Sequence, residues 1–150
     1  ADAKCTRPAE LLDIFPTLNE LCGLPKRDDL EGHSLVPQLQ DATTPREFPA
    51  ITTHNHDNHS IRSDDWRYIV YADGSEELYN MKNDPDEWHN LASKRKYRDI
   101  IESHRRFIPK ENRPPAAGSR HRILIYRDGT VNWEGTDIPE DEQIPELSLD

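Results

Sequence analysis

The chain has 150 residues, enough for one domain with a core of its own. Its hydrophobic residues make up only 33%, and even with the 6 Gly this stays below the roughly 45–50% typical of globular domains, so we expect disordered segments or a core completed against a partner surface. The formal net charge of -10 argues against a nucleic-acid partner, because contacts to phosphates need a cationic surface.

The sequence also argues against a membrane partner. No run of apolar residues approaches the roughly 20 needed to span a bilayer, and the first residues show no charged-then-apolar secretion signal. The chain starts at Ala1 and its only Met is Met81, which indicates a processed product or a piece cut from something longer. Cys5 and Cys22 match no metal or redox spacing, and whether they are bonded to each other is left open.

The first predicted element is a helix over residues 13–22. Apolar residues recur there at roughly helical spacing, and Gly23 followed by Pro25 predicts its end. Because Pro16 is tolerated only in a first turn, the helix is expected to begin near Asp13, whose side chain is a natural N-cap. Ser34 is expected to cap a second, short helix that ends near Gln40.

Residues 49–81 predict an antiparallel meander of four strands, at 50–53, 60–62, 66–71 and 77–81, with turns at 64–65 and 73–74. Residues 94–108 predict a helix that ends at Pro109. Its apolar stripe would consist of Tyr97, Ile100, Ile101, His104 and Ile108. We therefore expect an α+β fold, in which a four-stranded antiparallel sheet is packed by a C-terminal helix.

The residues from 109 onward are expected to lie outside the main domain. Residues 109–121 are rich in Pro, Ala and Gly and predict a linker after a domain over residues 1–108. Residues 122–126 and 130–133 flank Asp128-Gly129, which is typical of a β-hairpin. Beyond Arg127 no Lys or Arg appears, so residues 122–150 are expected to form a hairpin and a solvated acidic tail.

The strongest candidate for ligand contact is a loop with three histidines, His54, His56 and His59, followed by Arg62. On an extended backbone His54 and His56 would project from the same face, and His59 could fold back from the turn. Imidazole and guanidinium groups so placed suit an anion or a sugar, while an ordinary polar loop and a metal site remain alternatives. Arg67 is the weaker of the two arginine candidates, because it could balance Asp64 and Asp65 instead.

Other polar clusters carry weaker signals. The aspartates at positions 57, 64, 65, 84 and 86 do not have the spacing of an EF-hand calcium loop. Trp66, Trp88 and Trp133 could stack on sugar rings, but packing in the core and the hairpin is the expectation. No serine nucleophile elbow and no phosphate-binding glycine loop occurs, so nothing in this chain predicts a catalytic residue, a metal ligand or a cofactor of its own.

An ordered series of motifs over roughly residues 5–108 resembles the C-terminal part of type I sulfatases, especially the iduronate-sulfatase-like group of the alkaline-phosphatase-like superfamily. The motifs are ELLDIFPTL at 10–18 with ELCGLP at 20–25, LEGHSLVP at 30–37, HSIR at 59–62 with WRYI at 66–69, ELYN at 77–80 and NDPDEWHNL at 83–91. Any one of them is a weak signal, but the whole set in this order is specific.

The resemblance implies a large N-terminal part that holds the active site. In that family a Cys or Ser within Cys/Ser-x-Pro/Ala-x-Arg becomes formylglycine, and calcium stabilises the sulfate charge. Here Cys5 is followed by Pro8 and Arg7 at the wrong offsets, and no calcium-ligand motif of the family matches. The resemblance therefore implies that this chain is inactive alone, that formylglycine and calcium belong to the N-terminal catalytic part, and that the whole enzyme is periplasmic or secreted.

We expect this chain to be the C-terminal portion of a hydrolase of sulfuric esters, closing one wall of a pocket for sulfated carbohydrates with His54, His56, His59 and Arg62. The alternative is a free-standing module that binds a sugar or a metal without catalysis. A third reading is an assembly piece whose hairpin pairs with another chain through its exposed edge.

Overall fold

A computed structural model describes residues 3–113, 116, 124–127, 129–133 and 136–139 of the chain. The chain divides into two compact units, residues 1–113 and residues 114–150, and each is described by itself. Most of the expected linker at 109–121 and most of the expected acidic tail lie outside the described residues.

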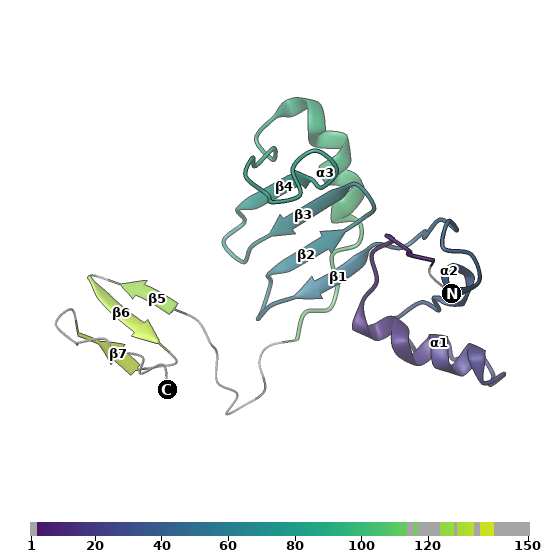
Figure 1. Ribbon diagram of the computed structural model, residues 1–150. Helices are drawn as coiled ribbons and strands as arrows, with labels where there is room; N and C mark the ends of the chain where they lie inside the picture. The colour runs from purple at the N-terminus through teal and green to yellow at the C-terminus, as the bar shows by residue number, and fades with distance from the viewer. Residues whose placement is uncertain (1–2, 114–115, 117–123, 128, 134–135, 140–150) are drawn as a thin grey trace, which may run out of the picture. The chain divides into compact units, whose positions relative to one another are not determined.

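The first unit contains the four-stranded antiparallel meander (Figure 1). Its strands are β1 (Ala50–Thr53), β2 (His59–Arg62), β3 (Trp66–Val70) and β4 (Glu76–Asn80), in the spatial order β1-β2-β3-β4. The turn between β3 and β4 contains Gly74 at φ +83, a backbone conformation that other residues rarely adopt. The α+β fold with this sheet, predicted from the sequence, is confirmed.

Helix α3 (Arg98–Arg105), preceded by the 3-10 turn η2 (Arg95–Tyr97), packs against one face of the sheet. Ile101 of this helix joins Ile61, Tyr68 and Leu78, which are paired across three neighbouring strands, in the buried core. Burial of each such side chain contributes about 1.5–3 kcal/mol. The stripe predicted for this helix is confirmed, because its members are buried or pack on this core: Tyr97, Ile100, Ile101, His104 and Ile108.

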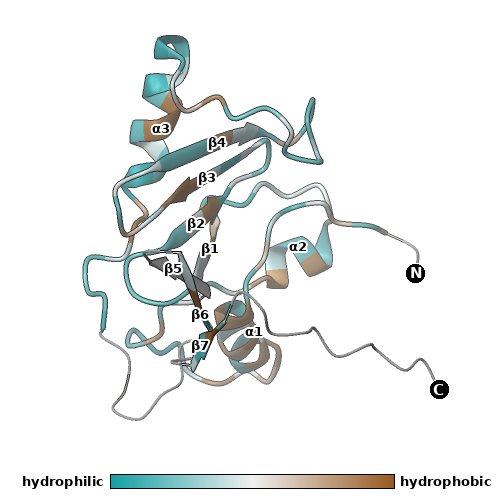
Figure 2. Cartoon of the chain, turned by 90° about the vertical axis from the view of Figure 1, so that its left-hand side faces the viewer, coloured by the Kyte–Doolittle hydropathy of each residue, from teal (hydrophilic) through white to brown (hydrophobic). Residues whose placement is uncertain are grey.

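The predicted first helix is α1 (Ile14–Leu21), which begins with a 3-10 turn, η1 (Leu11–Asp13), and is followed by Gly23 at φ +66. The expectation that the Asp13 side chain caps α1 is wrong. Because η1 already gives Asp13 helical backbone angles, φ -71 and ψ -20, its carboxylate does not point back onto the helix amides as an N-cap does. Helix α1 and a second short helix, α2 (Val36–Gln40), lie on the β1 side of the sheet (Figures 1 and 2).

Asp13 instead joins three separate segments of the chain. Its fully buried carboxylate accepts two hydrogen bonds from Arg46, at 2.7 and 3.1 Å, and one each from the backbone amides of Glu10 and His33, both at 2.9 Å. Burial alone would raise the pKa of Asp13, but these hydrogen bonds, led by that of Arg46, hold it below its ordinary value.

The loop after α1 is held tightly against η1. A side chain at Gly32 would place its Cβ 2.0 Å from the carbonyl oxygen of Leu12, so only glycine lets the loop approach this closely. The short helix α2 (Val36–Gln40) follows, with Leu35 rather than Ser34 at its N-cap position. The Ser34 hydroxyl still accepts a hydrogen bond from the amide of Val36, the first residue of α2, at 3.2 Å. Ser34 therefore contacts the start of the helix, but from one residue before the N-cap position.

The second unit is a three-stranded antiparallel sheet, β5 (Leu124–Arg127), β6 (Thr130–Trp133) and β7 (Thr136–Ile138), in that order. The β5–β6 pair is the hairpin predicted from Asp128-Gly129, although residues 122, 123 and 128 lie outside the described residues. Strand β7 falls in the stretch expected to be a solvated tail. Asn132 and Asp137 are paired across β6 and β7 and their side chains are 2.7 Å apart, a cross-strand contact that the charge pattern alone does not reveal.

Among the described residues, no helix has the length and apolar character that crossing a membrane requires.

Candidate functional site

The histidine loop, residues 54–58, connects β1 to β2 at one end of the sheet. The amide of His54 donates to the carbonyl of Asn58 at 2.9 Å and closes the loop. Asn55 and Asp57 have left-handed backbone angles, φ 58 and φ 62, so the loop is not extended. The expectation that His54 and His56 project from one face of an extended strand is therefore wrong.

His54 and His56 are nevertheless both exposed to solvent. The Nδ1 atom of His56 lies 2.7 Å from a carboxylate oxygen of Asp57. Asn58 fixes the loop from within, because its side chain donates to the carbonyl of His56 at 2.9 Å and accepts from the amide of Ala72 at 3.2 Å. The loop thus presents two imidazoles on a backbone tied to the neighbouring β3–β4 turn.

His59 has a different environment, since it is the first residue of β2 and only 4% exposed. Its Nδ1 lies 3.0 Å from the hydroxyl of Thr53, and its Nε2 lies 3.3 Å from the side-chain amide of Asn112. An amide nitrogen only donates, so Nε2 accepts and Nδ1 carries the proton. The same amide group donates to Asp57 at 2.6 Å, so His59 supports the loop from beneath rather than offering a free nitrogen.

Arg62 lies at the other end of β2 and on the other face, because it is three positions after His59 in the strand. Its Nη1 donates to the backbone carbonyls of Ser63, Asp64 and Trp66, at 2.7, 3.2 and 3.4 Å. The structure therefore does not bring Arg62 together with His59. Three residue steps along a strand correspond to roughly 10 Å.

The register of the sheet pairs Arg62 with Arg67 instead. Arg67 donates through Nε to the hydroxyl of Ser60 at 3.0 Å and through Nη1 to Glu87 at 2.8 Å. Burial, reinforced by repulsion from Arg67, lowers the pKa of Arg62 from its ordinary value. Arg62, Arg67, Ser60 and Thr52 line a hollow of about 310 Å³, which we name the paired-arginine hollow.

The sequence ranked Arg67 below Arg62 as a ligand-binding candidate, because the position of Arg67 beside Arg62 depends on strand pairing. Asp64, one of the two aspartates expected to balance Arg67, forms an ion pair with Arg7 instead. Alternating apolar residues in 66–70 predict a strand, but they do not fix which residue of β2 lies opposite. Two adjacent guanidinium groups are a suitable receptor for a tetrahedral or planar oxyanion.

The remaining candidates give a mixed result. Within the described ranges no three His, Cys, Asp or Glu side chains are placed to hold a metal ion, and Cys5 and Cys22 are exposed and unbonded. Trp66 packs on Tyr97 with ring centroids 5.4 Å apart, as expected. The expectation that Trp88 packs in the core is wrong, because its side chain is 79% exposed.

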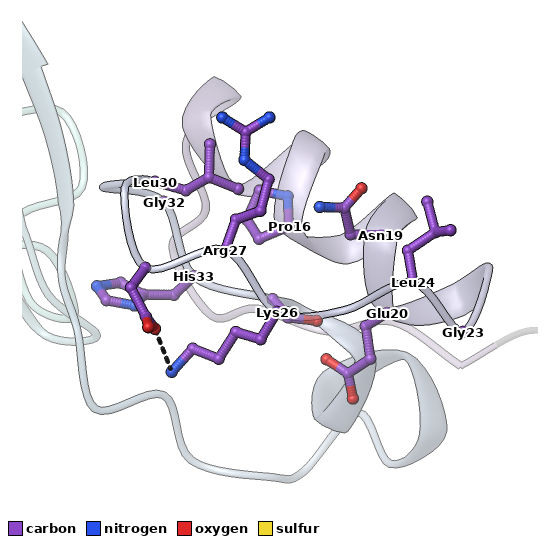
Figure 3. A pocket seen from close by; sticks show the side chains of 12 residues that line it. Pro16, Asn19, Glu20, Gly23, Leu24, Lys26, Arg27, Leu30, Gly32 and His33 are labelled. Carbon is purple, nitrogen blue, oxygen red and sulfur yellow. Dashed lines mark ion pairs between the residues drawn. The ribbon is translucent and has the colours of Figure 1, made fainter.

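A larger pocket of about 640 Å³ lies between α1 and the loop that follows it (Figure 3). Pro16 and Asn19 line one side, and the loop crosses over them with Lys26 and Arg27 (Figure 3). Both cations are near carboxylates, Lys26 4.0 Å from Asp28 and Arg27 hydrogen-bonded to Asp29. Because its charges are compensated locally, this pocket has no clear preference for an anion.

The segment from η1 through α1 to Leu24 carries the largest set of exposed apolar side chains among the described residues of the first unit. They are between 50% and 85% exposed, and Figure 2 shows the hydrophobic colouring along α1. We call them the α1 apolar surface: Leu11, Leu12, Ile14, Phe15, Leu18, Leu21 and Leu24. Large apolar patches of this kind mark places where a protein contacts another surface.

Comparison with known proteins identifies relatives of the first unit. A family described as "N-sulphoglucosamine sulphohydrolase, C-terminal" matches residues 4–113. A sulfatase of Formosa agariphila is 39% identical over 123 residues, which cover 82% of this chain and 24% of that protein. A delta 4,5-hexuronate-2-O-sulfatase of Bacteroides thetaiotaomicron is 33% identical over 116 residues, covering 71% of this chain and 24% of that protein.

A solved structure of a protein in complex with its substrate, D-glucosamine-2-N,6-O-disulfate, matches with a TM-score of 0.52 and 25% identity. The match covers 63% of this chain and 22% of that chain. The chain therefore spans about a quarter of the length of the curated relatives it matches. The matched family segment coincides with the first structural unit.

Proposed function

The chain belongs to the sulfatases through the C-terminal domain that matches residues 4–113, and on this basis we propose that it is the C-terminal part of an enzyme that hydrolyses sulfate esters of carbohydrates. Two relatives support the substrate class, because one is named for a hexuronate 2-O-sulfate and another is bound to a sulfated glucosamine. Sulfated hexosamines or uronic acids are therefore the substrates to test first. We also propose a periplasmic or secreted location for the enzyme.

The reactive groups belong to the rest of the enzyme in this proposal. The family implies formylglycine as nucleophile and a calcium ion that acts as a Lewis acid on the sulfate oxygens. The described residues of this chain contain no cluster suited to a metal ion, and Cys5 lacks the flanking residues of the formylglycine motif. This chain therefore contributes substrate contacts and structural support.

The observation that carries the proposal is the α1 apolar surface, seen in a domain whose relatives are about four times as long. Seven large apolar side chains exposed along η1, α1 and the residues just after α1 are costly in water, at about 25 cal/mol for each Å² left unburied. We propose that the preceding part of the sulfatase covers them. A free-standing binding module would leave this surface in solvent, so the structure favours a domain of a larger enzyme.

The substrate contacts in this proposal come from His54, His56 and Arg62, with His59 supporting the loop. The imidazoles of the histidine loop and the guanidinium of the paired-arginine hollow would donate to sulfate or carboxylate oxygens of the sugar. Short-range donors of this kind remain effective in a chain of net charge -10, because salt screens the distant acidic residues over about 8–10 Å.

Replacement of His56 or Arg62 by Ala in the full-length protein tests these contacts. A hydrogen bond between charged groups contributes about 1.5–3 kcal/mol, so each variant should lower kcat/KM on a sulfated sugar by about tenfold or more. His89→Ala and Arg106→Ala are matched controls, because both residues are exposed and neither belongs to the histidine loop or lines the paired-arginine hollow. Unchanged kcat/KM in the His56 and Arg62 variants, with normal thermal stability, would remove these residues from the substrate site.

A further inference from the structure

A separate cleft of about 540 Å³ runs along α3 and has not been used in the proposed function. Its volume lies within the range of about 300–1,000 Å³ typical of ligand pockets. One side is formed by α3, another by the segment 92–95 that leads into η2, and the start of β4 contributes Glu76. We call it the α3 cleft.

The α3 cleft carries a positive charge in a chain whose net charge is -10. Four cationic side chains line it, Lys94, Arg95, Arg98 and Arg105, against two carboxylates. Both carboxylates are bound to Arg105, Glu76 at 2.5 Å from its Nη2 and Glu102 at 2.5 Å from its Nη1.

The other three cations of the cleft, Lys94, Arg95 and Arg98, are exposed, and none forms an ion pair with another described residue. They stand close together in sequence at the start of the helix. Three uncompensated cations around one cleft favour an anionic ligand with several charges, because each contact to an exposed cation is weak by itself.

The lining also contains an apolar patch. These apolar residues are Ala92, which is half-buried, and Ile101, which is only 5% exposed. A cleft of this size with cations at its rim suits a sugar whose sulfate or carboxylate groups reach Lys94 and the arginines. The lining has no aromatic side chain on which a nucleic-acid base could stack.

The sheet connects this cleft to the histidine loop. Glu76 pairs with Val70 and Val70 pairs with His59, so Glu76 lies in the same cross-strand row as His59. Two strand spacings correspond to roughly 10 Å. The α3 cleft and the histidine loop are therefore close to the same end of the sheet, within reach of a single extended ligand.

We propose that the α3 cleft is a second binding site for an anionic polysaccharide and holds sulfated or carboxylated sugars of the substrate chain outside the catalytic pocket. The inference rests on the proposed function for the identity of the ligand. Such a site increases the affinity for long chains by adding a second contact on the same molecule, and it leaves the reaction of short substrates unchanged.

The test compares two triple variants of the full-length protein. One replaces the cations of the cleft, Lys94→Gln, Arg95→Gln and Arg98→Gln. The other removes the same charge from exposed residues outside the cleft, Lys82→Gln, Arg106→Gln and Lys110→Gln. Binding of a heparin-derived octasaccharide is measured by calorimetry at several salt concentrations, and kcat/KM is measured on a sulfated disaccharide.

The cleft variant should bind the octasaccharide about tenfold or more weakly and with a smaller salt dependence, since three charge contacts are lost. The control variant should stay within about twofold of wild type, as expected for surface charges outside the site. The proposal would be overturned if the cleft variant bound the octasaccharide as tightly as the control variant does. It would also be overturned if the cleft variant lost binding to a single-stranded oligonucleotide by the same factor as binding to the octasaccharide. Loss of the disaccharide reaction in the cleft variant would also contradict a site outside the catalytic pocket.

The result separates this inference from the proposed function. If the protein binds the octasaccharide through the cleft but releases no sulfate from any sugar, the proposed activity is wrong and the proposed binding site stands. If the protein releases sulfate and the cleft variant binds the octasaccharide normally, the proposed second binding site is wrong and the proposed activity stands.

Discussion

The carboxylate of Asp13 and the guanidinium of Arg46 form a doubly hydrogen-bonded ion pair, with distances of 2.7 and 3.1 Å and side chains only 0% and 4% exposed. The pair joins η1 to the segment that leads into β1. Because the amides of Glu10 and His33 also donate to this carboxylate, one buried charge organises the part of the domain that carries the α1 apolar surface.

Replacement of Arg46 by Met should strongly destabilise the domain. The change leaves the buried carboxylate of Asp13 without its cation, which costs about 3–5 kcal/mol. Arg27→Met is the matched control, because the Arg27–Asp29 pair is exposed to solvent and should be dispensable. Thermal unfolding of the full-length variants measures the difference, and equal melting temperatures for the two would contradict the assigned role of Asp13.

Asp13 should also make the domain sensitive to acid. Its folded-state pKa is below the ordinary 3.8, so the unfolded chain takes up the proton first as the pH falls. The stability that ionised Asp13 contributes is complete above about pH 3.8 and is lost as the pH falls through the folded value. Melting temperatures of wild type and Asp13→Asn should therefore converge only as the pH falls below about 3.8, whereas curves that stay parallel there would contradict the assignment.

His104 predicts a second pH dependence at higher pH. Burial lowers its pKa from the ordinary 6.5, although the hydrogen bond to Ile100 acts in the opposite direction. The Nδ1–H group donates to the carbonyl of Ile100 at 2.7 Å, so Nε2 accepts from the Ser63 hydroxyl at 2.9 Å. A base with a lowered folded pKa contributes stability above about pH 6.5 that is lost as the pH falls through the folded value.

His104→Gln should therefore flatten the fall in melting temperature between pH 7 and pH 5. His89→Gln serves as the control, because His89 is exposed and its loss should leave that fall intact. A pH profile of the His104 variant that matches wild type would show that His104 is not the titrating group.

The α1 apolar surface should have opposite effects in two contexts. Leu18→Ser in the full-length protein should reduce its stability by about 2 kcal/mol, since a buried leucine contributes about that much at an interface. In the isolated chain the same change should reduce self-association, because it removes exposed apolar area. Glu20→Ser on the same helix is the control, and sedimentation with thermal unfolding measures both effects. A full-length variant as stable as the control would show that Leu18 remains in solvent.

The strands and α3 could be predicted from the sequence because the signals that define them are local. Alternating apolar residues between Gly and Asp turns locate β3 and β4, and the stripe through Ile101 and His104 locates α3. The motif series identified the family for the same reason, since it needs only residues in order along the chain.

The arrangement of the site depends on long-range pairing, which local patterns do not contain. The left-handed backbone at Asn55 and Asp57 reverses the expected geometry of the histidine loop. The burial of His59 depends on Asn112, more than 50 residues away, and the position of Arg67 beside Arg62 depends on strand register. Only the folded chain brings these residues together.

Release of inorganic sulfate from a sulfated glucosamine or uronic acid, measured side by side for the full-length protein and for this 150-residue chain, tests the central claim most directly. We predict that the full-length protein releases sulfate and that this chain alone releases none. Turnover by the isolated chain at an enzymatic rate would contradict the account, and so would a full-length protein that hydrolyses none of these sugars.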